Sequence, residues 1–147
     1  MSDKFWDDLN QFKNRYQEML DDVCQSFGLN PAEANIILYL AKNKKDTATD
    51  IVKYTGYSKS NVSTAVRKLE LGDYLSTICP SENRRIVHLK LKEKSKPIIR
   101  YYQKQKKKLE DELFYGFSKE ELEALFLLSD KVSKNIIGKV NKNDEND

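Results

Sequence analysis

Histidine is almost absent from this sequence, and that scarcity limits the chemistry open to the chain. His88 is the only one among 147 residues. A lone imidazole excludes the usual multi-histidine metal site. It also weakens any catalytic scheme that needs an imidazole beside a nucleophile, and the sequence offers no paired carboxylates instead. We therefore expect no enzymatic activity, no metal site and no cofactor.

Cysteines and long apolar runs are scarce as well. Cys24 and Cys79 lie far apart in the sequence, and neither has a partner at motif spacing. No signal peptide and no apolar run of about 18 residues precedes them, which predicts a reduced, cytoplasmic protein that does not enter a membrane. Cys24 is either a packing residue or a peroxide-sensing thiol. The absence of a cationic neighbour within one helical turn favours packing.

Charge is abundant but unevenly distributed. The net charge is only +3, yet residues 53–108 carry 15 Lys and Arg against 4 Asp and Glu, while the rest of the chain carries 11 against 19. A basic block confined to one segment produces a focused positive field on one face of a folded protein. The partner that suits such a field best is a polyphosphate backbone.

The N-terminal segment has the pattern of one long amphipathic helix. Apolar residues at steps of three and four cover residues 3–27, and Gly28 ends the run. A helix of this length has more apolar surface than a small domain can cover. We therefore expect much of its apolar stripe to pack on a second protomer, the alternative being a helix packed wholly on its own domain.

The C-terminal segment predicts two further helices. The first should run from near Ser95 to Phe114, with Pro97 in its first turn, where no N–H group is needed. A capping box that begins at Ser118 should open the second. From about Gly138 the sequence becomes polar, and we expect a frayed tail there.

The middle of the chain carries the signals of two helices joined by a tight turn. Asn30 caps a first supporting helix, and a short helix over residues 49–54 follows it. Gly56 supplies the left-handed conformation that a tight turn between helices requires. Ser58 then caps a helix over residues 59–71.

Two strands joined by a polar tip follow these helices. The first strand is predicted over residues 74–79 and the second from Arg85 or Ile86 to about Leu91. Helix, turn, helix and β-ribbon, in this order, form a winged helix-turn-helix. The predicted fold class is therefore mainly α with a small antiparallel β-wing, flanked by long N- and C-terminal helices.

In such a motif the second helix enters the DNA major groove while the ribbon reaches along the backbone. The helix N-terminus favours a phosphate, and on its outward face Asn61 suits adenine and Arg67 suits guanine. The arginines of the tip suit phosphate or a narrow minor groove, and which of them contacts DNA stays open. The alternatives are a merely solvated helix face and a salt bridge from the tip to Glu82. The candidate DNA-binding residues are Ser58, Lys59, Ser60, Asn61, Ser63, Thr64, Arg67, Lys68, Arg84 and Arg85.

Several stretches in this order resemble the MarR family of bacterial transcription regulators, over residues 29 to about 136. They are Asn30–Leu40, Ser58–Leu75, the tip Asn83-Arg84-Arg85, and Ser118–Leu122. The resemblance implies a homodimer built by the terminal helices of both chains, with two winged domains on successive major grooves of a pseudo-palindrome. It also implies a repressor released by a small aromatic acid or by oxidation, as many members are. The chain departs from the family at Asn83, where an aspartate is usual.

We accordingly expect four segments. Residues 1–29 should form a dimerisation helix, 30–92 the DNA-binding domain, 93–137 further dimerisation helices, and 138–147 the polar tail. The predicted function is a sequence-specific transcription regulator that binds double-stranded DNA as a homodimeric repressor, with a small-molecule effector. The alternative is a winged-helix module that docks another protein, such as a replication factor, and binds nucleic acid non-specifically.

Effector-binding residues cannot be assigned from the sequence. Aromatic residues at helical spacing are more often part of a core than of a ligand pocket. The tyrosines that either line an effector pocket or belong to the core are Tyr16, Tyr39, Tyr54, Tyr101 and Tyr102.

Overall fold

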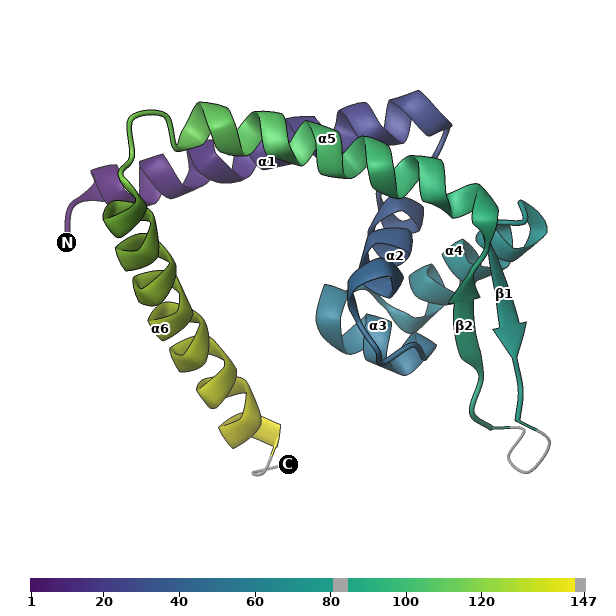
Figure 1. The fold of residues 1–147 in the computed structure, drawn as a ribbon. Coiled ribbons are helices and arrows are strands. Elements are labelled where there is room, and N and C mark those ends of the chain that lie inside the picture. Colours follow the sequence, from purple (N-terminus) through teal and green to yellow (C-terminus); the bar gives the residue numbers. More distant parts are fainter. Residues whose placement is uncertain (81–84, 145–147) are drawn as a thin grey trace. The chain divides into compact units, whose positions relative to one another are not determined.

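The computed structural model describes residues 1–80 and 85–144, with side chains up to residue 138 (Figure 1). It confirms the predicted class, a mainly helical fold with a two-stranded antiparallel sheet. The chain divides into two compact units, Met1–Leu109 and Glu110–Asp147. The elements are α1 (Asp3–Phe27), α2 (Pro31–Lys42), α3 (Ala48–Thr55), α4 (Lys59–Leu71), β1 (Leu75–Ile78), β2 (His88–Leu91), the 3₁₀-helix η1 (Glu93–Ser95), α5 (Lys96–Leu113) and α6 (Lys119–Asp144).

Helix α1 packs against the rest of the first unit through its C-terminal half. The side chains of Met19, Leu20, Val23 and Cys24 are buried there. The N-terminal half of the same stripe stays at the surface in this single chain. Its exposed members are Phe5, Trp6, Leu9, Phe12 and Tyr16. The predicted surplus of apolar surface on this helix is therefore present.

The core of the first unit is assembled around α2. Ile36 and Ile37 of this helix are fully buried, and they are joined in the core by Ile51 of α3 and Leu69 of α4. Burying one such side chain is worth about 1.5–3 kcal/mol, so this small group stabilises the arrangement of the three helices strongly. The start of α2 is fixed by the predicted cap, because Asn30 accepts a hydrogen bond from the Glu33 N–H and the Glu33 carboxylate accepts one from the Asn30 N–H.

The short helix α3 is one residue longer at each end than the sequence predicted. Thr47 caps it, since its hydroxyl oxygen accepts a bond from the Asp50 N–H at 3.2 Å, while the Asp50 carboxylate accepts from Thr47. This is a capping box with aspartate in place of the usual glutamate or glutamine. The sequence pattern therefore did not indicate Thr47 as the cap. Helix α4 has the predicted bounds, and Gly56 has the predicted positive φ of 75°.

The β-wing is shorter than predicted. Its register pairs Leu75 with Leu91 and Ile78 with His88. The expected strand residues that are not in the ladder are Tyr74, Cys79, Arg85, Ile86 and Val87. Pro80 follows the end of β1 and has no N–H group to donate, which explains why pairing stops there. Residues 81–84 of the predicted tip lie outside the described residues.

Helix α5 lies beside the C-terminal half of α1 in the first unit (Figure 1). The hydroxyl groups of Tyr16 and Tyr102 are 3.1 Å apart, and the Tyr101 hydroxyl donates to the Asp22 carboxylate at 2.7 Å. The ring of Tyr101 also contacts that of Phe27 edge-on, with 5.5 Å between centroids. These contacts from two distant segments fix α1 against α5.

The second unit contains the end of α5 and the whole of α6. The predicted capping box is confirmed, because Glu121 and Ser118 exchange hydrogen bonds at the start of α6. The expectation of a frayed tail from Gly138 is wrong for residues 138–144, which continue the helix to Asp144. No proline interrupts this stretch, and one glycine lowers helix stability by only about 1 kcal/mol. Residues 145–147 lie outside the described residues.

Candidate nucleic-acid interface

Helix α4 separates a buried face from an exposed one. Val62, Ala65 and Leu69 are buried and hold the helix on the core of the first unit. From residue 58 to residue 68 the opposite face consists of polar or charged side chains, all of them exposed, and the exposed Leu71 follows at the C-terminal end of the helix. These polar and charged residues are Ser58, Lys59, Ser60, Asn61, Ser63, Thr64, Arg67 and Lys68. The structure thus brings eight of the ten predicted site residues together on one surface.

The start of α4 is fixed by a single side-chain cap. The Ser58 hydroxyl oxygen accepts a hydrogen bond from the Asn61 N–H at 3.0 Å, as the sequence predicted. The remaining N–H groups of the first turn have no partner within the helix and, with the helix dipole, give this end a partial positive charge. An anion that approaches the first turn meets donors that are already oriented.

The turn between α3 and α4 is fixed to the core by a tyrosine. The Asn35 side-chain amide of α2 donates to the Tyr57 hydroxyl at 2.9 Å, and both residues are half-buried. The Gly56 N–H donates to the Val52 carbonyl at 2.9 Å, which closes the end of α3. The angle between the two helices therefore depends on a bond that joins the turn to α2. The sequence gave no signal for this contact.

The base of the wing is tied to the end of α4 by several polar contacts. Asp73 has a positive φ of 68° and forms an ion pair with Lys92. The hydrogen bond and the charge of Lys92 hold the pKa of the Asp73 carboxyl below its usual value. Lys94 donates to the Gly72 carbonyl at 2.7 Å and lies 4.4 Å from the centroid of the Tyr74 ring.

A buried serine completes this base. Ser95 is fully buried, and its hydroxyl donates to the Tyr74 carbonyl at 2.7 Å. The Lys92 N–H donates to the same carbonyl at 2.9 Å. These two bonds fix the point where the chain enters and leaves the wing. The sequence placed Ser95 only near the start of a predicted helix and gave no sign of a buried bond, so sequence reasoning missed this role.

The two sides of the wing each contact the helix-turn-helix. On β1, the Thr77 hydroxyl donates to the Glu70 carboxylate of α4 at 2.8 Å. On β2, His88 Nδ1 lies 2.6 Å from Asp46 Oδ1 in the loop before α3, and Thr47 forms an isolated bridge with His88. These contacts give His88 a structural role, because they join β2 to the loop before α3.

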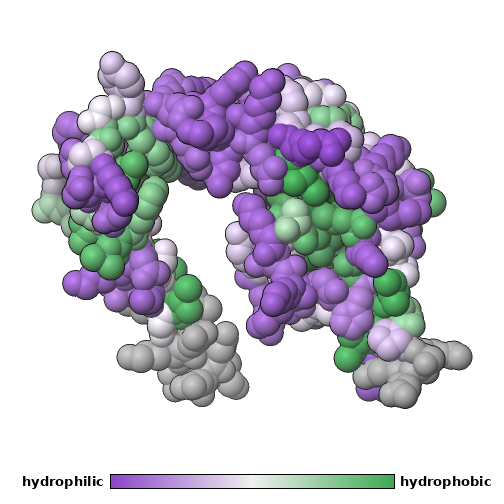
Figure 2. Space-filling model, viewed as in Figure 1, coloured by the Kyte–Doolittle hydropathy of each residue, from purple (hydrophilic) through white to green (hydrophobic). Residues whose placement is uncertain are grey.

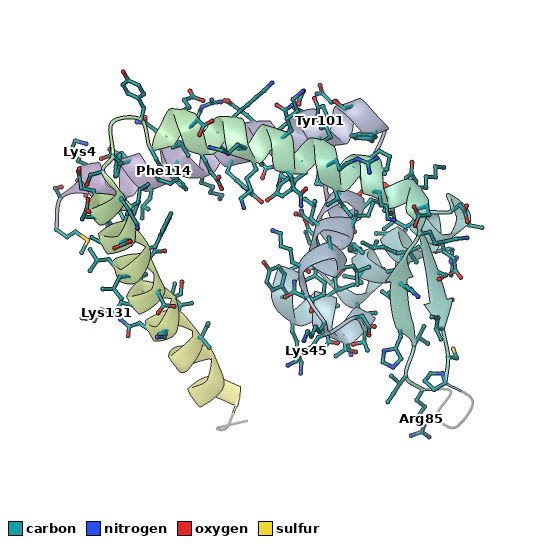
Figure 3. The ribbon with its side chains drawn as sticks, in the orientation of Figure 1. Lys4, Lys45, Arg85, Tyr101, Phe114 and Lys131 are labelled. Carbon is teal, nitrogen blue, oxygen red and sulfur yellow. The ribbon has the colours of Figure 1, made fainter. Side chains whose placement is uncertain are left out.

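Of the two predicted wing arginines, only Arg85 is described. Its side chain is exposed and lies beyond the tip-side end of β2 (Figure 3). Arg84 falls outside the described residues, so its predicted role remains a prediction. Figure 3 also shows Lys45 in the loop before α3. Arg85 and the exposed face of α4 are thus carried by separate parts of the fold, the wing and the helix-turn-helix.

The environment of Cys24 favours packing over redox sensing. The thiol is buried in α1, and this burial, with smaller contributions from the carboxylates of Asp21 and Glu33, raises its pKa. The reactive species in peroxide sensing is the thiolate, which a raised pKa disfavours. Cys79, by contrast, is exposed next to the end of β1.

The five candidate tyrosines fall into two separate groups. Tyr16, Tyr101 and Tyr102 join α1 to α5, as described above. The rings of Tyr39 and Tyr54 contact each other within the helix-turn-helix, with 4.8 Å between centroids. Tyr39 and Tyr102 are buried, which agrees with a packing role for these two.

Residues 1–80 and 85–144 contain neither a candidate metal centre nor a candidate membrane span. In this part of the chain no three His, Cys, Asp or Glu side chains are grouped so that they could hold a metal ion. None of the described helices combines the length and the apolar character needed to cross a membrane.

Two of three comparisons with known proteins give matches. The model of the MarR family matches residues 27–85. No curated protein matches the chain by sequence. Among solved structures, a MarR/EmrR family transcriptional regulator from Acinetobacter sp. ADP1 is 24% identical, with a TM-score of 0.72 over 92% of this chain and 96% of that one.

Two structures from Staphylococcus aureus were solved with bound molecules. MarR in complex with salicylate and kanamycin is 13% identical, with a TM-score of 0.77 over 92% of each chain. A MepR mutant bound to an oligodeoxyribonucleotide is 15% identical, with a TM-score of 0.60 over 92% of this chain and 99% of that one. At these identities the likeness shows the fold.

Proposed function

We propose that the chain is a sequence-specific, DNA-binding transcription regulator of the MarR family, whose model matches residues 27–85. In this proposal a homodimer acts as a cytoplasmic repressor and binds a pseudo-palindromic operator in double-stranded DNA. A small effector releases it. The observation that carries the proposal is the continuous polar face of α4, whose members are all exposed while the opposite side of the helix is buried.

The face of α4 supplies both kinds of contact that a DNA reader needs. Near the N-terminus, Lys59 and Ser60 suit the phosphate backbone, because the oriented N–H groups and the dipole favour an anion at the same place. Further along the same face, Asn61 and Arg67 suit adenine and guanine edges in the major groove. Phosphate contacts would position the helix, and base contacts would give it sequence preference.

The wing would add contacts to the DNA backbone. Arg84 and Arg85 have guanidinium groups that pair with phosphate oxygens and also suit a narrow minor groove of high negative potential. The location of Arg85 beyond the end of β2 supports this role (Figure 3). Because the wing and α4 are separate elements, the two sets of contacts would lie on different parts of one half-site.

Dimerisation would use the apolar surface that this single chain leaves exposed. In α1, Trp6 is 61% exposed and Phe12 is 50% exposed. Helix α6 has a similar surplus, and Figure 2 shows hydrophobic residues gathered along it. Its exposed apolar residues include Leu125, Phe126, Leu127, Leu128, Val132, Ile136 and Ile137. Exposed apolar residues in such number on each of the two helices favour a protein–protein interface.

The DNA-binding proposal is tested by comparing a specific and a random duplex. A 20–30 base-pair duplex from the protein's own promoter region, identified by DNase protection, is titrated at near-physiological salt with competitor DNA present. We expect Arg67→Ala to weaken binding to the specific duplex by about 10-fold or more and to affect random DNA little. We expect Arg84→Ala to weaken all sequences evenly and to reduce the salt dependence.

Two outcomes would argue against these roles. Equal losses on both duplexes for both variants would contradict the division between base and backbone contacts. Uniform weak binding by the wild-type protein would favour the alternative function, a protein-docking module with non-specific affinity for nucleic acid. Release of the specific duplex by salicylate tests the effector, and S. aureus MarR, whose structure contains this molecule, supports the choice.

The dimer is tested by placing a charge in the apolar stripe of α1. Leu9→Asp should shift the sedimentation coefficient from that of a dimer to that of a monomer, because an unpaired carboxylate is costly to bury. Gln11→Asp is the matched control, since it adds the same charge to the exposed polar side of the same helix. A wild-type protein that sediments as a monomer at micromolar concentration would refute the dimer.

A further inference from the structure

A polar contact joins the wing to the loop in front of α3. His88 Nδ1 of β2 and Asp46 Oδ1 are 2.6 Å apart, although the two residues are 42 positions apart in the sequence. Because a carboxylate only accepts hydrogen bonds, the imidazole donates its Nδ1–H. The backbone reinforces the same junction, since the Leu89 N–H donates to the Asp46 carbonyl at 3.0 Å. We refer to the Asp46–His88 contact as the clasp.

The loop side of the clasp is held in place by the cap of α3. Thr47, the next residue after Asp46, is bonded to Asp50 through both its backbone N–H and its hydroxyl. Thr47 also bridges to His88 across the junction. The position of Asp46 is therefore fixed by the helix-turn-helix. Because His88 is bonded to Asp46, the clasp also fixes β2 relative to the helix-turn-helix.

The wing side of the clasp lies at a sensitive point of the ribbon. The β-ladder contains only four residue pairs, and His88 belongs to the pair nearest the tip, opposite Ile78. A two-stranded hairpin of this size is at best marginally stable by itself in water. The opposite end of the ribbon is already fixed at Tyr74, whose carbonyl accepts from Ser95 and Lys92. The clasp thus attaches β2 at its tip-side end, three residues from Arg85 in the sequence.

We propose that the clasp is a positioning device that makes the wing and α4 bind DNA as one pre-organised unit. The proposal rests on the proposed function and assigns Asp46 and His88 a role in it that requires no contact of their own with DNA. With the clasp intact, Arg85 lies at a fixed place relative to the face of α4. Without it, the ribbon beyond its base has to be ordered when DNA binds, and that cost reduces the affinity.

The clasp affects binding through geometry more than through overall stability. His88 and Asp46 have side chains that are 42% and 34% exposed, and pairs this accessible to water add little to folding. A His88→Ala variant should therefore fold. Its loss of DNA affinity should be confined to the contribution of the wing, and the contribution of α4 should remain.

A double-mutant cycle on DNA binding tests this separation. We expect His88→Ala to weaken binding of the promoter duplex about 10-fold, similar to Arg85→Ala alone, as expected for loss of one charge-assisted contact. In the His88→Ala background, Arg85→Ala should then reduce the affinity for the promoter duplex by less than about 2-fold, because the effects of substitutions at residues that act as a unit are not additive. Arg67→Ala should cost the same in both backgrounds.

Two further variants separate positioning from a general structural defect. His88→Asn places an amide nitrogen near the position of Nδ1 and should restore most of the wild-type affinity. Tyr101→Phe is the matched control, because it removes two hydrogen bonds between α1 and α5, those with Asp22 and Ser26, and none in the wing. It should leave the affinity for DNA unchanged.

Amide hydrogen exchange tests the clasp without DNA. The Leu89 N–H should exchange about 10-fold faster in His88→Ala than in the wild type, and His88→Asn should restore its protection. The proposal would be overturned if Arg85→Ala reduced DNA affinity equally in the wild-type and His88→Ala backgrounds. It would also be overturned if the Leu89 N–H exchanged at the same rate in His88→Ala as in the wild type. If the wild-type protein binds no duplex, the proposed function fails and the role of the clasp in DNA binding fails with it. The Leu89 exchange rate alone then shows whether the clasp holds the wing.

Discussion

The cap of α4 offers a sharp test of the candidate interface, because one hydroxyl group affects both stability and the proposed DNA contact. Ser58 accepts a single hydrogen bond, from the Asn61 N–H at 3.0 Å. Replacing an N-cap serine by alanine costs about 1 kcal/mol, within a range of about 0.5–2 kcal/mol. For a protein of this size, Ser58→Ala should lower Tm by about 2–4 °C at fixed protein concentration.

The same loss should reduce DNA affinity, because the first turn of α4 would have to form again on binding. A free energy of about 1 kcal/mol corresponds to about a 5-fold weaker complex, from K = exp(−ΔG/RT). Asn30→Ala is the control, since Asn30 accepts the equivalent bond at the start of α2, at 2.8 Å from the Glu33 nitrogen. It should lower Tm by a similar amount and leave the affinity unchanged.

Ser58→Gly distinguishes the cap from the hydroxyl group itself. Glycine is a tolerable N-cap and costs only a few tenths of a kcal/mol relative to serine. If helix order matters, this variant should bind almost as tightly as the wild type; if the hydroxyl contacts phosphate, it should bind as weakly as Ser58→Ala. Thermal melts and fluorescence anisotropy provide both quantities. A Ser58→Ala protein that is destabilised but keeps full affinity would refute the placement of this helix end at the DNA.

Two further predictions concern the helix that precedes the recognition turn. Gly56→Ala should destabilise the protein by about 1 kcal/mol in denaturant titrations, because the φ of 75° strains an alanine although nothing lies within 4 Å of its added Cβ. An unchanged midpoint would show that the strain is absorbed elsewhere. The Thr47 hydroxyl, with smaller help from Lys45 and Lys53, holds the pKa of Asp50 below its usual value. The stability that Asp50 contributes is therefore present above about pH 4 and is lost as the pH falls through the lower, folded-state pKa. In Asp50→Asn the free energy of unfolding should therefore depend less on pH below about pH 4. If the variant and the wild type show the same dependence of this free energy on pH, Asp50 is not the group responsible.

The helices were well predicted because their boundary signals are local. Asn30, Ser58 and Ser118 each bond to a group three residues away, and that spacing can be read directly from the chain. Gly28 and Gly56 end helices because their own backbone adopts a positive φ. The exposed face of α4 follows from the same periodicity, so eight predicted site residues share one surface.

The wing was less well predicted because its boundaries depend on pairing. An apolar, β-branched stretch such as Ile86-Val87 favours a strand, yet the ladder ends at His88. What decides the end is where the opposite strand stops, and β1 stops at Ile78, shortly before Pro80. The tail was predicted poorly for a different reason. Polar composition indicates solvent exposure, and an exposed segment can still be helical, as α6 is to Asp144.

The sequence alone determined the order of the elements, the caps that start the helices and the concentration of positive charge in residues 53–108. Each of these depends on residues within about one helical turn or on composition. Only the tertiary structure decided which distant residues meet, such as Asp46 with His88, or Ser95 with the Tyr74 carbonyl. These contacts join segments 42 and 21 residues apart, and such segments are brought together only by the packing of the helices around their shared core.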